Sequence, residues 1–257
     1  LHMMDVHQYV YGEDSALFGS AYSDIYDNSI HHTDGTVGRL LTHMAENGLL
    51  EKTLIVITSD HGEAFSERGL EGHAKHVFRE STEVPFILGL PVQLETGITI
   101  DSRSRNIDVW PTILDILGLP PIEDSDGRSL LPEILAAFEE EDGLASEDLA
   151  ISHLDRTWGQ RAHGPKPAVA VIEDGFRYIY APERDGTLIE YLFDGNADEL
   201  ERRDVKEEHP ERIEPLRASA LQYLEDSPPA PWGSGAATVD INEMELNQLR
   251  ALGYELD

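Results

Sequence analysis

The segment from Thr53 to Ser59, TLIVITS, is an apolar and β-branched run that constrains the fold more than any other part of the chain. Such a run, bounded by polar residues, is typical of a strand that is buried on both faces. It follows a segment, Tyr22 to Leu49, in which apolar residues recur at helical spacing and which Gly48 is suited to end. Because a helix followed by a buried strand is the unit of a parallel sheet, the sequence predicts an α/β fold.

The next hundred residues continue this pattern of strands and helices. Val84 to Leu90 and Ile98 to Arg103 are apolar enough to form two further strands. The stretch NIDVWPTILDILGLPP predicts a helix, since Pro111 is tolerated in a first turn and Gly118 can end it. Asp126 to Ala137 is expected to be a turn followed by a short helix.

The remainder of the chain predicts a smaller antiparallel unit. Asp174-Gly175 divides AVAVIEDGFRYIYA into two strands, which is a strong hairpin signal. Other expected elements are an acidic surface loop over 139–148, a third antiparallel strand from Leu188, a helix over 210–224, a connector over 227–237 and a last helix over 240–254. We therefore divide the chain into an α/β domain over 1–146 and an antiparallel β plus helix subdomain over 147–257.

The charge balance excludes some classes of partner. The formal net charge is −31, from 50 acidic and 19 basic residues, of which only Lys52, Lys75, Lys166 and Lys206 are lysines. No basic patch can offset such a field, so we expect no binding to nucleic acid. Since salt screens self-repulsion, an acidic and lysine-poor chain indicates a high-salt organism, such as a haloarchaeon.

Composition says less about where the protein acts. The chain has no cysteine, which excludes disulfides and thiolate metal sites but leaves the redox compartment undetermined. No apolar run reaches the roughly 20 residues that cross a bilayer, so we expect no transmembrane segment. We favour a soluble, cytoplasmic protein over a secreted one.

Candidate metal ligands follow the central strand directly. In open α/β sheets ligands gather beyond the carboxyl ends of the strands, where Asp60 and His61 lie. A carboxylate and an imidazole in that place can bind one divalent cation through oxygen and nitrogen. The alternative is a structural turn in which Asp60 caps backbone amides and a carbonyl satisfies His61. Two ligands are too few for a closed site.

Other histidines and a lysine lie in loops near this point in the sequence or near the amino terminus. His73, Lys75 and His76 fall within one Gly-rich loop, and His7 follows Asp5. Such a cationic cluster can hold an oxyanion or protonate a leaving group. The alternative is an exposed loop with incidental histidines.

Several segments together resemble the sulfatase family of the alkaline phosphatase superfamily. TLIVITSDHGEAFSERG and GHAKHVFRESTEVPFIL are similar to its metal-binding core, and MDVHQYVY is similar to its Asp-Pro-His-x-Pro-Tyr segment, with Val6 and Val10 replacing the prolines. NIDVWPTILDILGLPPIEDSDGRSLLP and the closing RALGY also resemble family segments. The resemblance covers nearly the whole chain in order and implies an alkaline phosphatase-like mixed or parallel sheet, flanked by helices, with a small C-terminal antiparallel subdomain.

The resemblance also implies roles for individual residues. Asp60 and His61 match the second pair of metal ligands, which hold Ca²⁺ in sulfatases and Mn²⁺ or Zn²⁺ in relatives that cleave phosphoesters. His7 matches a histidine on the sulfate oxygens, and His73 matches one near the leaving-group oxygen. Lys75 is a weaker match as a catalytic residue, and His76 is weaker still as a substrate contact.

Two parts of the family site have no match in the chain. No Cys, Ser or Thr occurs in the family's nucleophile pattern, Cys/Ser-x-Pro-x-Arg, and the first pair of metal carboxylates has no counterpart. We therefore expect the carboxy-terminal half of a sulfatase-like hydrolase, inactive without its amino-terminal half. Three hypotheses stay open for the intact protein: a sulfatase acting on a small molecule or glycan, a phosphodiesterase or phosphoglycerol- or phosphoethanolamine-type transferase, and a non-catalytic binding module.

Overall fold

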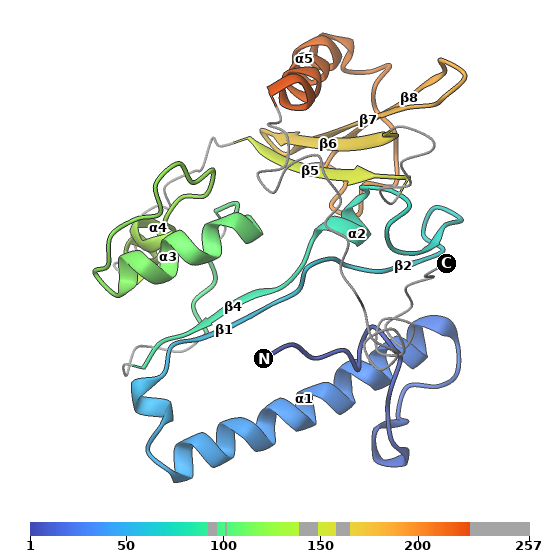
Figure 1. Cartoon of the computed structure of the whole chain (residues 1–257). Helices are drawn as coiled ribbons and strands as arrows, with labels where there is room; N and C mark the ends of the chain where they lie inside the picture. Colours follow the sequence, from blue (N-terminus) through green and yellow to red (C-terminus); the bar gives the residue numbers. More distant parts are fainter. Residues whose placement is uncertain (92–96, 101, 139–148, 158–164, 227–257) are drawn as a thin grey trace, which may run out of the picture. The chain divides into compact units, whose positions relative to one another are not determined.

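The computed structural model (Figure 1) describes residues 1–91, 97–100, 102–138, 149–157 and 165–226. The chain divides into two units, Leu1–Ala220 and Leu221–Asp257, and the account below concerns the first. The predicted boundary at residue 146 stays a prediction. The acidic loop over 139–148, the connector and the last helix lie outside the described residues.

The described elements alternate between helices and short strands in the first half and become mainly strands in the second. The helices are α1 (Tyr22–Glu46), α2 (Arg79–Thr82), α3 (Val109–Ile116), α4 (Leu131–Phe138) and α5 (Pro210–Asp226), and the 3-10 turns are η1 (Glu13–Ser15), η2 (Leu50–Lys52) and η3 (Asn106–Asp108). The strands are β1 (Ile55–Thr58), β2 (Ala64–Phe65), β3 (Glu71–Gly72), β4 (Phe86–Gly89), β5 (Ala150–Asp155), β6 (Pro167–Glu173), β7 (Phe176–Pro182) and β8 (Leu188–Asp194). No helix among the described residues is both long and apolar enough to cross a membrane.

The first sheet is a two-stranded ribbon, which Figure 1 shows running side by side as β1 and β4. Both strands lie in segments where the sequence predicts strands, but they pair antiparallel, with Ile57 opposite Ile87. The parallel pairing favoured by the helix–strand order is therefore not seen in the described part of the chain. The predicted burial differs as well, because Ile57 is 38% and Ile87 56% exposed. The described residues thus leave apolar faces of this ribbon uncovered.

The four-stranded sheet confirms the antiparallel strands that the sequence predicts for the second half of the chain. Its four strands follow one another in the order β5-β6-β7-β8, every pair antiparallel. Asp174 and Gly175 turn the β6–β7 hairpin with φ values of 50° and 79°, the left-handed region that an Asp-Gly turn supplies. The strand predicted over Ile98 to Arg103 is wrong for its described residues, while β5 was not predicted.

The four-stranded sheet supports the loop that carries the candidate histidines. Val77 and Phe78, which directly precede α2, are buried against Ala170, Ile179 and Phe193 of this sheet. The Arg68 guanidinium lies over the rings of Phe78 and Phe193, at 4.6 and 4.9 Å from their centroids. The loop between β1 and β4 is therefore fixed by the antiparallel unit as well as by its own strands.

Candidate active site

The turn after β1 holds His61 in one orientation. Its Nδ1 lies 2.9 Å from the carbonyl oxygen of Gly62, which can only accept a hydrogen bond. The proton is thereby assigned to Nδ1, and Nε2 keeps a free lone pair. Gly62 itself donates from its amide to Ser81 O at 3.0 Å. A Cβ at position 62 would meet Glu80 O at 2.2 Å, so only glycine allows this turn to pack on α2.

A short hairpin brings His73 to the same place. β2 and β3 pair with Ala64 opposite Gly72, and continuing this register by one residue places Glu63 opposite His73. The Glu63 Oε2 lies 3.0 Å from the His73 Nδ1. A carboxylate at neutral pH only accepts, so the Nδ1 carries the proton and Nε2 is free for another partner.

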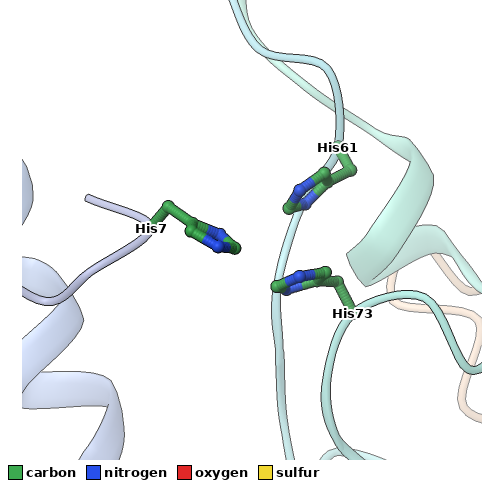
Figure 2. Close-up of side chains that lie close together, drawn as sticks. All are labelled: His7, His61 and His73. Atoms are coloured by element: carbon green, nitrogen blue, oxygen red, sulfur yellow. The ribbon is translucent and has the colours of Figure 1, made fainter. Parts of the chain in front are cut away.

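His7 reaches these two rings from the amino-terminal turn. That turn is closed by the Gln8 amide on Met4 O at 3.0 Å and the Val10 amide on Asp5 O at 2.8 Å. The ring centroid of His7 lies 5.1 Å from that of His73 and 6.1 Å from that of His61. Figure 2 shows the three rings turned toward one another from three chain segments. One nitrogen from each ring lies within 4.8 Å of the others.

The stacking of two of these rings limits what the cluster can bind. His61 and His73 are 4.1 Å apart between centroids and 25° from parallel. The lone pair of an imidazole nitrogen lies in its ring plane, so the free lone pairs of these two rings lie in separate, nearly parallel planes and do not converge on one ion. The geometry therefore favours separate partners for His61 and His73.

Asp60 lies beside His61 and faces solvent. Its side chain is 80% exposed, and its Oδ1 lies 3.9 Å from the His61 Nε2 and accepts a hydrogen bond from the His61 amide at 3.1 Å. Two atoms bound to the same ion lie about 3 to 4 Å apart, given bond lengths of about 2.0 to 2.6 Å. The pair therefore fits as part of a cation site, with the remaining ligands still to be supplied.

The other two predicted residues of this loop do not join the three-histidine cluster. The Lys75 Nζ donates to the carbonyl oxygen of Glu71 at 2.8 Å. His76 is 8% exposed, its Nδ1 lies 3.2 Å from Ser81 Oγ, and its ring is 5.1 Å from that of Phe78. Burial lowers the pKa of His76. Its place is in the packing beneath the loop.

Sequence reasoning missed Glu63. Its side chain is only 5% exposed, and no partner is found for its buried Oε1 among the described residues. Burial is the largest cause that raises the pKa of Tyr9 and of Tyr26, and the charge of Glu63 adds to both shifts. The pairing of β2 with β3, which the structure shows and the sequence does not predict, is what places Glu63 opposite His73.

Comparison with known proteins agrees with the fold. Residues 1–119 match the family model described as Sulfatase. Over 229 residues the chain is 29% identical to the choline-sulfatase of Rhizobium meliloti (strain 1021). The aligned residues make up 87% of this chain and 40% of that relative.

Two solved structures extend the likeness. One is the structure of a protein in complex with its substrate D-glucosamine-2-N,6-O-disulfate, with a TM-score of 0.66 and 26% sequence identity. The match covers 80% of this chain and 42% of the chain in that structure. The other, a 2-O GAG sulfatase, has a TM-score of 0.62 and 21% identity over 79% of this chain and 42% of its own. The predicted fold class is confirmed as the mixed α/β, alkaline phosphatase-like fold of sulfatase structures, with a small antiparallel sheet. The chain spans less than half the length of each of these proteins.

Proposed function

Since residues 1–119 match the sulfatase family, we propose that the intact protein is a sulfatase that hydrolyses a sulfate ester. The observation that carries this proposal is the convergence of His7, His61 and His73 beyond the end of β1. Sulfuryl transfer places negative charge on the peripheral and leaving oxygens, and polar hydrogens fixed at those positions stabilise it.

We assign the side chains according to their free atoms. Asp60 and His61 hold a divalent cation, with Ca²⁺ expected and Mn²⁺ or Zn²⁺ as alternatives, and this ion when bound supplies positive charge to the ester oxygens. His7 contacts the sulfate oxygens. His73 acts as its imidazolium: Nδ1–H stays on Glu63, the proton on Nε2 passes to the leaving alkoxide, and the ring returns to the Nδ1–H form. A role for Lys75 requires that its ammonium leave the Glu71 carbonyl, and a role for His76 requires that its ring leave the core.

The nucleophile and the other cation ligands lie, in our proposal, in sequence outside these 257 residues. The chain has no cysteine, and it spans 40% of the choline-sulfatase. The exposed apolar side chains on β1 and β4 support the same conclusion, as does Trp110 of α3, which is 63% exposed. We expect the additional sequence to cover these surfaces, and this chain to be inactive by itself.

Two relatives support a substrate class for the proposal. One is named for choline sulfate hydrolysis, and a structural neighbour binds a sulfated glucosamine as its substrate. We therefore propose a small-molecule or glycan sulfate ester. We also propose, from the excess of acidic residues, that the protein works in a high-salt environment.

Measuring sulfate release by the complete gene product tests the function. Choline sulfate, 6-O-sulfated glucosamine and a phosphodiester would be compared as substrates. We expect His73→Asn to lower turnover about 100-fold or more, as loss of a general acid does. His43→Asn, at an exposed ring in the last turn of α1, is the control and should leave turnover unchanged. Cleavage of the phosphodiester alone would favour phosphoryl transfer, and no cleavage of any ester would favour a binding module.

A further inference from the structure

We infer that Glu63 is a positioning residue that fixes the ring of His73 and the nitrogen that this ring presents to the site. The Glu63 carboxylate and the His73 imidazole meet at 3.0 Å, through Oε2 and Nδ1. The use of His73 in catalysis rests on the proposed function, whereas the orientation of its ring does not.

The backbone places these two residues opposite each other. The antiparallel pairing of Ala64 with Gly72 continues naturally to Glu63 and His73. Gly72 has a φ of 83°, in the left-handed region that side chains disfavour, so the chain turns there just before His73. The hairpin therefore sets the distance between carboxylate and imidazole before any ligand arrives.

Burial protects the contact between Glu63 and His73 from water. The Glu63 side chain is 5% exposed and that of His73 is 24% exposed, so water competes little for the carboxylate. Loss of the His73 donor would weaken the compensation of this buried carboxylate, since no partner is found for its Oε1 among the described residues. The same bond therefore holds both side chains.

His61, the ring stacked on His73, also has a free Nε2, although a different acceptor holds its Nδ1. His61 reaches the same state through the backbone carbonyl of Gly62, at 2.9 Å. Two different acceptors, a backbone carbonyl and a carboxylate, thus hold Nδ1–H on the two stacked rings and leave Nε2 of each ring available. Acceptors behind an imidazole that fix its tautomer are typical of rings that serve a ligand.

The tautomer can be read directly. Long-range ¹H–¹⁵N correlation on the ¹⁵N-histidine-labelled 257-residue chain, at one fixed pH where the histidines are neutral, distinguishes a protonated Nδ1 from a protonated Nε2. We expect the Nδ1–H form for His73 in the unmodified chain. Glu63→Met fills similar space without an acceptor and should make the Nε2–H form dominant, while Glu63→Gln retains an oxygen acceptor and should keep the Nδ1–H form. Glu71→Ala, at an exposed carboxylate of the same hairpin, is the matched control.

The His61 signal serves as an internal standard, because its acceptor is a backbone carbonyl that none of these substitutions removes. An Nε2–H tautomer of His73 in the unmodified chain would overturn the inference, and that measurement does not depend on how any variant folds. An unchanged His73 tautomer in Glu63→Met would overturn it as well.

Activity of the complete gene product supplies a second, separate readout. We expect Glu63→Met to lower kcat about 10- to 100-fold with little change in KM, as loss of a supporting hydrogen bond does. Combined with His73→Asn it should add nothing, whereas a purely structural role for Glu63 would add its own loss. Tautomers as expected in a protein without sulfatase activity would refute the proposed function and leave the positioning role intact.

Discussion

Replacing Arg177 with alanine should destabilise the chain strongly. The Arg177 side chain on β7 is 2% exposed, and its Nε lies 2.8 Å from each carboxylate oxygen of Glu201, which is 6% exposed. Its other nitrogens donate to Thr82 Oγ1 at 3.0 Å and Glu83 Oε1 at 3.1 Å, at the end of α2. One side chain thereby joins the antiparallel sheet to the segment on which Gly62 packs.

The size of the effect follows from burial. Removing one partner of a buried ion pair leaves the other charge uncompensated and costs about 3 to 5 kcal/mol. That is a large part of the roughly 5 to 15 kcal/mol by which domains are stable. For a urea m-value of about 2 to 3 kcal/mol/M, the midpoint should fall by about 1 to 2.5 M.

Urea titration followed by far-UV circular dichroism measures this, with two comparison variants. Arg203→Ala breaks an exposed pair with Glu208, the two side chains being 64% and 51% exposed, and should cost about 1 kcal/mol or less. The double variant Arg177→Met/Glu201→Leu removes both charges together and should recover most of the loss. If Arg177→Ala and Arg203→Ala shift the midpoint equally, the reasoning from burial is wrong.

Four further predictions follow from the same structure and sequence. KCl at about 2 M should raise the thermal midpoint by screening the net charge of −31, and an unchanged midpoint would remove the high-salt argument. Burial lowers the pKa of His76, so the stability due to its neutral ring is complete above about pH 6.5 and lost as the pH falls below that value; His76→Leu should flatten this part of a urea-midpoint profile. Gly62→Ala should cost about 1 to 3 kcal/mol in urea titration, because its Cβ would lie 2.2 Å from Glu80 O, whereas Gly48→Asn should cost less, since a Cβ there meets nothing within 4 Å and asparagine tolerates its φ of 63°. Calorimetry should show Ca²⁺ binding weaker than micromolar, since Ca²⁺ takes six to eight oxygen ligands, of which Asp60 supplies at most two while His61 offers a nitrogen; sub-micromolar affinity would contradict the proposal that ligands are missing from this chain.

The sequence predicts those elements whose cause is local. The helix α1 follows from apolar periodicity, and the β6–β7 hairpin follows from Asp174-Gly175. Strand direction has no such local cause, because a run such as TLIVITS fits either a parallel or an antiparallel neighbour. The strand β5, with its polar Ser152 and His153, forms through pairing with β6, and no such partner exists among the described residues for the segment from Ile98.

The candidate site divides in the same way. The sequence indicates Asp60 and His61 because both follow the strand directly. It places His7 and His73 there only through resemblance, since a meeting of three loops depends on tertiary packing. Glu63 lies within the segment that resembles the family's metal-binding core, but that resemblance gives it no role, and its contact with His73 depends on the register of a two-residue ladder.

The antiparallel sheet is a structural support for the site, although it contributes none of the three histidine rings. Phe78 lies in the core with Ala170 and Phe193, and it directly precedes the short helix α2, where the Glu80 carbonyl leaves no room for a side chain at Gly62. A change in that sheet can therefore move His61 without touching it. The division at residue 146 stays a prediction, and described residues on its two sides share one core within the unit Leu1–Ala220. The turn after β1 depends on this shared core for its position.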